Sequence, residues 1–434
     1  MIDKPEQTTQ AVKLRQNAWH GDDQVQLSFP GAWKVQLIQA EELPKLTPEQ
    51  LLSSLNAPIG SKVLKDICSN SKKPVILVDD LTRPTPITAV LSLILAELNN
   101  AGIKNSSITI LIACGTHEGI TLEDINKKLG GKVPEEIRVI THECHKCELL
   151  GYTSTTTPIQ TNPYILESDL KIGIGGIYPH PIAGFSGGGK LLVLGAGGYD
   201  TIRILHDQKS GSRDRDGSID HGFRREVNEI TRLIGYDFSI NLVLNADREV
   251  AALFCGDPEK AFQTGVEFYN QHFSVNIHEN ADIVISDMYP FDTDFQYAFD
   301  RGLWPFLNCR KRTMKIILAS SPQGISNHPL FPVRNPLITR LVRRIKHFHF
   351  RDLMQLKQRV NALLNVIKRR KLELFVVSQS INKQGLLRVL PQGKRIDSWN
   401  EMEELIYQRF DRNANIKVAI YKTAPLLMIQ RQED

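Results

Sequence analysis

The sequence is poor in cysteine and lacks any long apolar run, and both absences narrow the class of protein. Six cysteines among 434 residues are too few for a disulfide-stabilised scaffold. No apolar run approaches the roughly 18 residues that a membrane-spanning helix requires. The first residues are polar and contain no apolar core of a signal peptide, so we expect a cytoplasmic protein. The net charge of +5 is too small to favour nucleic acid or a membrane surface as a partner.

What is present is the composition of a folded globular protein, with 41% hydrophobic and 23% charged residues. The length predicts one very large domain or two to three ordinary ones. A polar connection at residues 272–280 precedes a new strand pattern. We therefore expect an N-terminal cofactor-binding and catalytic domain over residues 1–273. A C-terminal α/β domain over residues 274–434 would complete the substrate site.

Short apolar runs alternate with helical patterns along the chain, which predicts an α/β protein with mainly parallel sheets flanked by helices. We expect the active site in the cleft between its two domains. A helix is predicted over residues 86–100, with Gly102 just after its end. The predicted strands are residues 73–80, 107–113, 171–177, 281–286, 314–319 and 373–377.

Polar residues follow several of these predicted strands. The carboxyl ends of parallel strands lie at one edge of a sheet, where ligands bind in open α/β folds. Such residues are therefore candidates for a common site. They are Asp80, Arg83, His117, His180 and Gln296.

A glycine-rich segment at residues 184–190 (GFSGGGK) ends in Lys190. It matches the first seven positions of a phosphate-binding loop, but Leu191 follows where Ser or Thr would hold Mg²⁺. Glycines let backbone N–H groups approach an anionic ligand closely. An enzyme that binds a nucleotide or a phosphate is therefore one interpretation. The candidate cofactor-binding residues of this loop are Ser186, Gly187, Gly188, Gly189 and Lys190.

The flanks of the loop carry a resemblance to a known family. Residues 179–206 place His180 before the loop and His206 after Lys190. This arrangement resembles the nickel-pincer lactate racemase family. The resemblance implies a covalently tethered cofactor, nickel pyridinium-3,5-bisthiocarboxylic acid mononucleotide, bound to Lys190 through a thioamide. It also implies that His206 is the nickel ligand and that His180 is one of two catalytic bases.

Two earlier motifs agree with this resemblance and occur in the family's order. Residues 79–86 (DDLTRPTP) resemble its D-x-T-R-P-x-P element, and residues 113–118 (ACGTHE) resemble its G-T-H element. By resemblance, His117 is the second base, and Asp80 and Arg83 line the substrate site.

The chemistry of a 2-hydroxy acid suits these residue types. Removing hydride from the α-carbon gives a planar 2-keto acid, and returning hydride to the opposite face inverts the centre. No side chain accepts hydride, so a cofactor must. Histidines suit reversible proton transfer at neutral pH, and an arginine such as Arg83 suits a carboxylate. The predicted function is therefore a racemase or epimerase of a 2-hydroxy carboxylic acid. We expect the proteins that synthesise the cofactor to load it onto this protein. A homodimer is a possible oligomeric state.

The second half departs from the family at one position. Residues 286–301 resemble its Y-P…Q-x-x-K element, with Gln296 matching the glutamine. Phe299 stands where the family has a lysine, and Arg301 is the nearest cation. We expect Gln296 and Arg301 to bind substrate, and the change at Phe299 leaves the substrate unidentified. Two alternatives remain: a nickel-independent nucleotide- or phosphate-binding enzyme, and a relative that has lost turnover.

Two further features have plainer interpretations. The segment 142–147 (HECHKC) resembles a metal site, but it lacks a second ligand pair, so a polar loop is favoured. Residues 340–371 combine many basic residues with aliphatics at helical spacing, which is typical of amphipathic helices with a solvated basic face.

Overall fold

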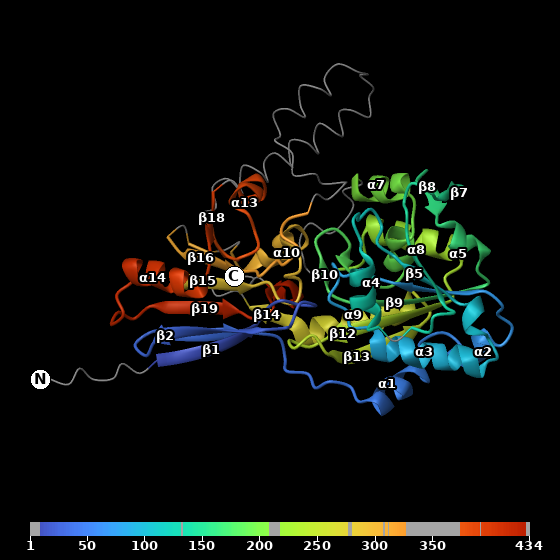
Figure 1. The fold of residues 1–434 in the computed structure, drawn as a ribbon, viewed down its shortest axis with the longest axis horizontal. Helices are drawn as coiled ribbons and strands as arrows, with labels where there is room; N and C mark the ends of the chain where they lie inside the picture. Colours follow the sequence, from blue (N-terminus) through green and yellow to red (C-terminus); the bar gives the residue numbers. More distant parts are fainter. Residues whose placement is uncertain are drawn as a thin grey trace, which may run out of the picture. The chain divides into compact units, whose positions relative to one another are not determined.

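The structure is a computed structural model that describes residues 9–131, 133–207, 218–276, 280–306, 309–310, 312–326, 374–390 and 392–430. The chain forms two compact units (Figure 1). The smaller unit comprises Met1–Gln39 and Ile277–Pro425, and the larger unit comprises Ala40–Asn276 and Leu426–Asp434. Within the described ranges, no helix is both long and apolar enough to cross a membrane.

This division differs from the expected domains 1–273 and 274–434 at both ends of the chain, since Leu426–Asp434 belong to the larger unit. The expected first domain included the first 39 residues, whereas the structure groups them with the later part of the chain. The reason is β3 (Lys34–Ile38), which pairs in parallel with β19 (Lys417–Tyr421). The sequence around β3 gives no sign of a partner so far along the chain.

The larger unit is built on a six-stranded sheet with the strand order β13-β12-β9-β4-β5-β6. All neighbours in it are parallel except β12 and β13, which are antiparallel. Its strands are β4 (Pro74–Val78), β5 (Thr109–Ile112), β6 (Arg138–Thr141), β9 (Leu170–Gly176), β12 (Phe238–Leu244) and β13 (Val250–Gly256).

Helices cover both faces of this sheet, which explains why β4 is apolar at every position. Ile76 and Val78 share a core with α1, α2 and α3, which run along one face (Figure 1). Val75 and Leu77 point to the other face and share a core with residues of α5 and α6. The helices of this unit are α1 (Pro48–Leu55), α2 (Leu64–Cys68), α3 (Thr88–Asn100), α4 (Leu122–Leu129), α5 (Pro163–Glu167), α6 (Lys190–Gly195), α7 (Tyr199–Asp207), α8 (Gly222–Ile234) and α9 (Lys260–Phe273).

Three two-stranded pairings complete the larger unit. Antiparallel pairs are formed by β7 (Glu148–Tyr152) with β8 (Pro158–Thr161) and by β10 (Pro179–His180) with β11 (Gly184–Phe185). Near the end of the chain, β20 (Met428–Gln430) pairs in parallel with β14 (Ser274–Asn276).

The smaller unit has an entirely parallel six-stranded sheet with the order β18-β17-β16-β15-β19-β3. An antiparallel hairpin, β1 (Thr9–Arg15) and β2 (Gln24–Pro30), contributes Phe29 to the core that this sheet shares with Trp399 and Met402. The remaining elements are β15 (Ile283–Asp287), α10 (Phe295–Gly302), β16 (Met314–Leu318), β17 (Leu374–Val377), α13 (Lys383–Val389), β18 (Gly393–Ile396) and α14 (Trp399–Arg409).

The predicted fold class is confirmed, since both units have mainly parallel sheets flanked by helices. Each predicted strand corresponds to one of β4, β5, β9, β15, β16 and β17, and the predicted helix corresponds to α3. Gly102 lies just beyond that helix with a φ of 85°. The basic segment 340–371 lies outside the described residues.

Candidate active site

The candidate site lies at the carboxyl edge of the larger sheet, where the strand order changes direction. From β4 the chain proceeds to β5 and β6 on one side, and later to β9 and β12 on the other. Such a switch point is where open α/β sheets leave room for a ligand. The loops after β4, β5 and β9 carry Asp80 and Arg83, His117, and His180 respectively.

Asp80 and His117 form the central contact of the site. Oδ2 of Asp80 lies 2.6 Å from Nδ1 of His117. Thr82 donates its backbone N–H to Oδ1 of Asp80 at 2.9 Å, and its hydroxyl donates to the same oxygen. Burial alone would raise the pKa of Asp80, but His117 and Arg83 outweigh burial and hold that pKa well below its usual range. Asp80 is therefore a carboxylate at neutral pH.

This contact fixes the tautomer of His117. An ionised carboxylate only accepts hydrogen bonds, so Nδ1 of His117 is the donor. In the neutral ring, the lone pair is then on Nε2. An imidazole oriented by a carboxylate in this way is the arrangement of a general base. The His117 side chain is 12% exposed, so it is held in place but reachable.

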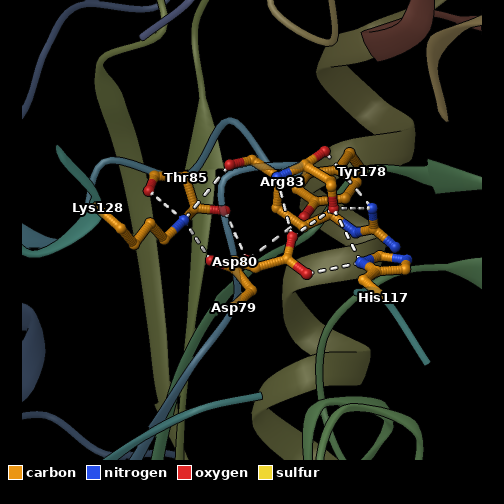
Figure 2. A network of polar contacts seen from close by, with 8 residues as sticks. Asp79, Asp80, Arg83, Thr85, His117, Lys128 and Tyr178 are labelled. Atoms are coloured by element: carbon orange, nitrogen blue, oxygen red, sulfur yellow. Dashed lines mark hydrogen bonds and ion pairs between the residues drawn. The ribbon is translucent and has the colours of Figure 1, made fainter. Parts of the chain in front are cut away.

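Arg83 is half-buried and lies beside this pair (Figure 2). Its guanidinium donates to the hydroxyl of Thr82 at 2.9 Å. Within the described residues it forms no ion pair with Asp79, which is bound instead by Lys128. A guanidinium held by a neutral partner keeps its charge available for a carboxylate ligand.

His180 has the opposite tautomer. It is buried in β10, and its Nδ1 lies 3.2 Å from the backbone nitrogens of both Ile182 and Ala183. Backbone N–H groups can only donate, so Nδ1 accepts and the proton of the neutral ring is on Nε2. Gly184, the first residue of β11, has a φ of 68°. The two predicted bases therefore differ in which ring nitrogen carries the proton.

The glycines of the glycine-rich loop are required for packing. A Cβ on Gly189 would lie 2.0 Å from the hydroxyl of Thr231, and one on Gly188 would lie 2.8 Å from Phe262. Gly187 has a φ of 97°, which side chains rarely adopt.

The backbone amides of the loop bind within the protein. Gly188 N–H donates to the side chain of Asn241 at 2.8 Å, and Ser186 N–H donates to the carbonyl of Tyr178 at 2.9 Å. Two amides of the loop, those of Ser186 and Gly188, therefore already have partners within the protein. The hydroxyl of Ser186 is buried and has no hydrogen-bond partner among the described residues.

Arg224 donates hydrogen bonds to backbone carbonyls in and next to the same loop. Its guanidinium is buried, donates to the carbonyls of Ala183, Phe185 and Gly187 at 2.5 to 3.3 Å, and lies 4.2 Å from the centre of the Phe262 ring. Burial lowers the pKa of Arg224 to about 9. Nothing in the sequence pattern distinguished this arginine from a surface residue.

Lys190 begins α6 and His206 lies in the last turn of α7. Nδ1 of His206 is 2.7 Å from the carbonyl oxygen of Ile202, so Nδ1 donates and the lone pair of the neutral ring is on Nε2. Burial, together with the nearby charges of Lys190 and His117, lowers the pKa of His206 to about 4. His206 is therefore a neutral nitrogen donor close to both residues, as a metal ligand must be.

The segment at residues 142–147 has a structural role. Nε2 of His142 lies 2.9 Å from the carbonyl of Gly197, and Nδ1 lies 3.0 Å from the amide of Asn162. Both ring nitrogens are thus engaged, and burial lowers the pKa of His142 to about 4. In the part of the chain that the structure describes, no group of three or more His, Cys, Asp or Glu residues could hold a metal ion.

Gln296 and Arg301 lie on α10 of the smaller unit. The Arg301 guanidinium is buried, lies 4.7 Å from the centre of the Phe291 ring and donates to the carbonyl of Tyr297 at 2.6 Å. Phe299 is buried against Phe295, at 5.2 Å between ring centres. The position of the family's lysine thus belongs to the apolar packing of this unit.

Sequence reasoning missed the polar residues behind the site (Figure 2). Lys128 of α4 is buried and forms an ion pair with Asp79. Thr85 donates to the same carboxylate at 2.9 Å, and the hydroxyl of Tyr178 lies 3.5 Å from it. The doubled aspartate after β4 was a possible signal, but a lysine in an amphipathic helix normally predicts a solvated side chain.

The chain is similar to known proteins in sequence. The sequence family described as the lactate racemase N-terminal domain matches residues 20–217. A lactate racemase from Thermoanaerobacterium thermosaccharolyticum is 30% identical over 305 residues, which cover 68% of this chain and 69% of that protein. A lactate racemase from Lactiplantibacillus plantarum is 30% identical over 258 residues, covering 58% of this chain and 60% of that protein.

Two solved structures share the fold. The lactate racemase apoprotein from Thermoanaerobacterium thermosaccharolyticum matches with a TM-score of 0.72 and 21% identity, over 97% of this chain and all of that one. A protein from Thermotoga maritima matches with a TM-score of 0.63 and 19% identity, over 90% of this chain and all of that one. Sequence and fold agree over most of the length, and the chain belongs to the lactate racemase family.

Proposed function

We propose that the protein is a nickel-dependent racemase or epimerase of a 2-hydroxy carboxylic acid. The observation that carries this proposal is His206, a neutral nitrogen donor in the neighbourhood of Lys190 and His117. Its Nδ1 is occupied by the carbonyl of Ile202, which leaves Nε2 as the coordinating atom.

The residues present fit a tethered nickel pincer nucleotide. Lys190 would carry the covalent bond and Nε2 of His206 would bind the metal. When bound, the cofactor supplies an electrophilic carbon that accepts and returns hydride. A single histidine ligand suits a metal whose other ligands come from the cofactor, in keeping with the lack of a larger ligand cluster among the described residues. The unpartnered hydroxyl of Ser186 is a candidate cofactor contact, and Gly187, Gly188 and Gly189 would shape the loop.

The chain's own residues would handle the proton and the carboxylate. Nε2 of His117, oriented by Asp80, accepts the proton of the substrate hydroxyl. His180, the second catalytic residue, donates a hydrogen bond from Nε2–H to the same oxygen. Arg83 binds the substrate carboxylate. Inversion requires the planar 2-keto acid to present its opposite face to the returning hydride, so its oxygen would move from His117 toward His180 while Arg83 keeps the carboxylate bound.

In the smaller unit, we propose a substrate contact for one residue only. The side-chain oxygen of Gln296 is buried without a hydrogen-bond partner among the described residues, which makes Gln296 the candidate substrate contact. The role of Arg301 stays a prediction. Phe299 replaces a cation with an aromatic ring, so we expect a 2-hydroxy acid other than lactate.

Intact-protein mass spectrometry tests the tether. The protein, purified from a host that makes the pincer cofactor, should carry a covalent adduct and nickel. Lys190→Ala should carry neither, whereas Lys65→Ala, which removes an exposed lysine of α2, should carry both. An adduct on Lys190→Ala would contradict the assignment.

Chiral chromatography of a panel of 2-hydroxy acids tests the reaction. Inversion of one member by nickel-loaded protein is the expected result. Activity in a preparation without nickel would favour a nickel-independent enzyme, and no inversion by the loaded protein would favour a relative without turnover.

A further inference from the structure

Lys128 is a buried ammonium group that the proposed reaction does not use. It lies in α4, and its side chain is 1% exposed. The preceding residue, Lys127, forms an ion pair with Glu123 at 2.8 Å on the surface of the same helix. Removing an ammonium from water costs several kcal/mol, so a buried lysine requires good partners. Three groups that Lys128 contacts belong to the loop that follows β4.

Lys128 binds this loop at three points (Figure 2). Nζ forms an ion pair with Oδ1 of Asp79. It donates to the carbonyl oxygen of Thr85 at 2.9 Å and lies 3.4 Å from the carbonyl oxygen of Arg83. One side chain therefore connects both ends of the loop to α4. Burial lowers the pKa of Lys128, and the carboxylate of Asp79 opposes that shift.

The two consecutive aspartates after β4 have different partners. Asp79 binds Lys128, and Asp80 binds His117, with the lysine and the histidine on opposite sides of the pair (Figure 2). Because the two aspartates are adjacent in the chain, a shift of the backbone that moves Asp79 also moves Asp80. The bonds of Lys128 to the loop thus limit where Asp80 and Arg83 can lie.

We propose that Lys128 is a positioning residue, which holds the loop after β4 so that Asp80 orients His117 and Arg83 faces the ligand. The effect of Lys128 on activity rests on the proposed racemase function, whereas its effect on the position of the loop does not. Without Lys128, Asp79 is a buried carboxylate without a counter-ion, and the carbonyls of Arg83 and Thr85 lose their donor. The loop then relaxes and weakens the contact between Asp80 and His117.

NMR of the full-length apoprotein tests the effect on the loop. The Nδ1 proton and ring-nitrogen shifts of His117, assigned with His117→Gln, report the contact with Asp80. We expect Lys128→Met to broaden or shift these signals and Lys127→Met to leave them unchanged. Asp79→Asn combined with Lys128→Met removes both charges and keeps the fold measurable. We expect altered His117 signals there too, because the two carbonyls still lack a donor.

Activity of the nickel-loaded protein tests the catalytic meaning. We expect kcat/KM for inversion to fall on the order of 100-fold in Lys128→Met and in the double variant. Lys127→Met should stay within about twofold, since exposed ion pairs contribute little. Folded Lys128 variants with native His117 signals would overturn the proposal. Altered His117 signals in a protein whose wild type inverts no 2-hydroxy acid would uphold the positioning role and reject the racemase function.

Discussion

The two sheets differ in strand order, and they use carboxylates differently at their carboxyl edges. Both have a strand at which the order changes direction, β4 in the larger unit and β15 in the smaller. Acidic residues follow each strand. In the larger unit, Asp79 and Asp80 bind the side chains of Lys128 and His117. Carboxylates paired with side chains can take part in chemistry, because their partners can move protons or bind ligands.

In the smaller unit, the carboxylates mainly bind backbone. Asp287, at the end of β15, accepts N–H groups of Tyr289 and Thr423 at 3.1 and 3.0 Å. Asp292 accepts those of Asn17 and Ala18 at 2.7 and 3.2 Å, together with the hydroxyl of Ser320. Burial raises the pKa of Asp287 to about 8 and also raises that of Asp292, whereas His117 and Arg83 keep that of Asp80 low.

At one edge the carboxylates pair with side chains that the proposed function uses or positions, and at the other they join loops. It follows that substitutions at the first edge should reduce turnover with little effect on folding. Substitutions at the second edge should act on stability.

His117→Gln should give the largest effect. Loss of the proton acceptor should lower kcat for inversion by about 10² to 10⁴-fold, with Tm nearly unchanged. Chiral chromatography and differential scanning calorimetry measure the two quantities. His272→Gln, which removes a histidine paired with Glu41 on the same unit, is the control and should keep its activity. A large fall in Tm for His117→Gln would assign this edge to structure.

Asp292→Ala should give the opposite result. Two backbone N–H groups and one hydroxyl lose their acceptor, which should lower the free energy of unfolding of the smaller unit by about 3 kcal/mol. Urea titration combined with hydrogen exchange resolves the two units. Glu404→Gln, on the exposed side of α14, should leave stability unchanged. Comparable exchange in Asp292→Ala and the wild type would contradict the structural role.

Arg83→Lys should have an intermediate effect that separates charge from geometry. The substitution keeps a cation beside Thr82 but loses the planar group that binds a carboxylate through two bonds. We expect kcat/KM to fall by about 10 to 100-fold, mostly through KM. Arg225→Lys, at an exposed arginine paired with Asp220, is the matched control. An unchanged KM would exclude Arg83 from substrate binding.

The smallest effect should be a difference in pH dependence. Asp287 has a folded pKa of about 8, above its unfolded value near 3.9. Its contribution to stability is therefore complete below about pH 4 and is lost as the pH rises to about 8. Asp287→Asn lacks this loss, so its Tm relative to wild type should rise by a few degrees over that range.

Scanning fluorimetry between pH 4 and 9 measures this slope. The hydrogen bonds from Thr423 and Tyr289 favour the charged form and keep the effect modest. For Asp80, the sign is reversed: its contribution is present above its unfolded pKa and is lost in acid. Parallel Tm curves for Asp287→Asn and wild type would show that the carboxyl does not titrate in this range.

The sequence predicted those parts of the fold that depend on local pattern. Strands buried on both faces, such as β4 and β15, are continuous apolar runs and were found. By contrast, β3 has a mixed pattern and joins its sheet only through β19. Pairing over such a distance leaves no trace near β3, which is why the sequence predicts the first 39 residues in a different unit from the one in which the structure groups them.

In the candidate site too, the sequence predicts the features that depend on local pattern and misses those that depend on tertiary contacts. Residues that follow strands, such as Asp80 and His117, could be located from the strand pattern. The proton positions of His180 and His206 could not, because they depend on backbone groups of local turns. Lys128 was missed because a lysine in a short helix looks solvated until its partners are known.

The pairing of β3 with β19 also has a consequence for how the chain is made. β19 begins about 380 residues after β3 ends, which corresponds to roughly 20 to 80 s of ribosomal synthesis. During that time the sheet of the larger unit, from β4 to β13, is completely available to fold. Until β19 is synthesised, β3 has no strand to pair with. Its polar residues Lys34 and Gln36 disfavour pairing with strands of other chains, which would lead to aggregation.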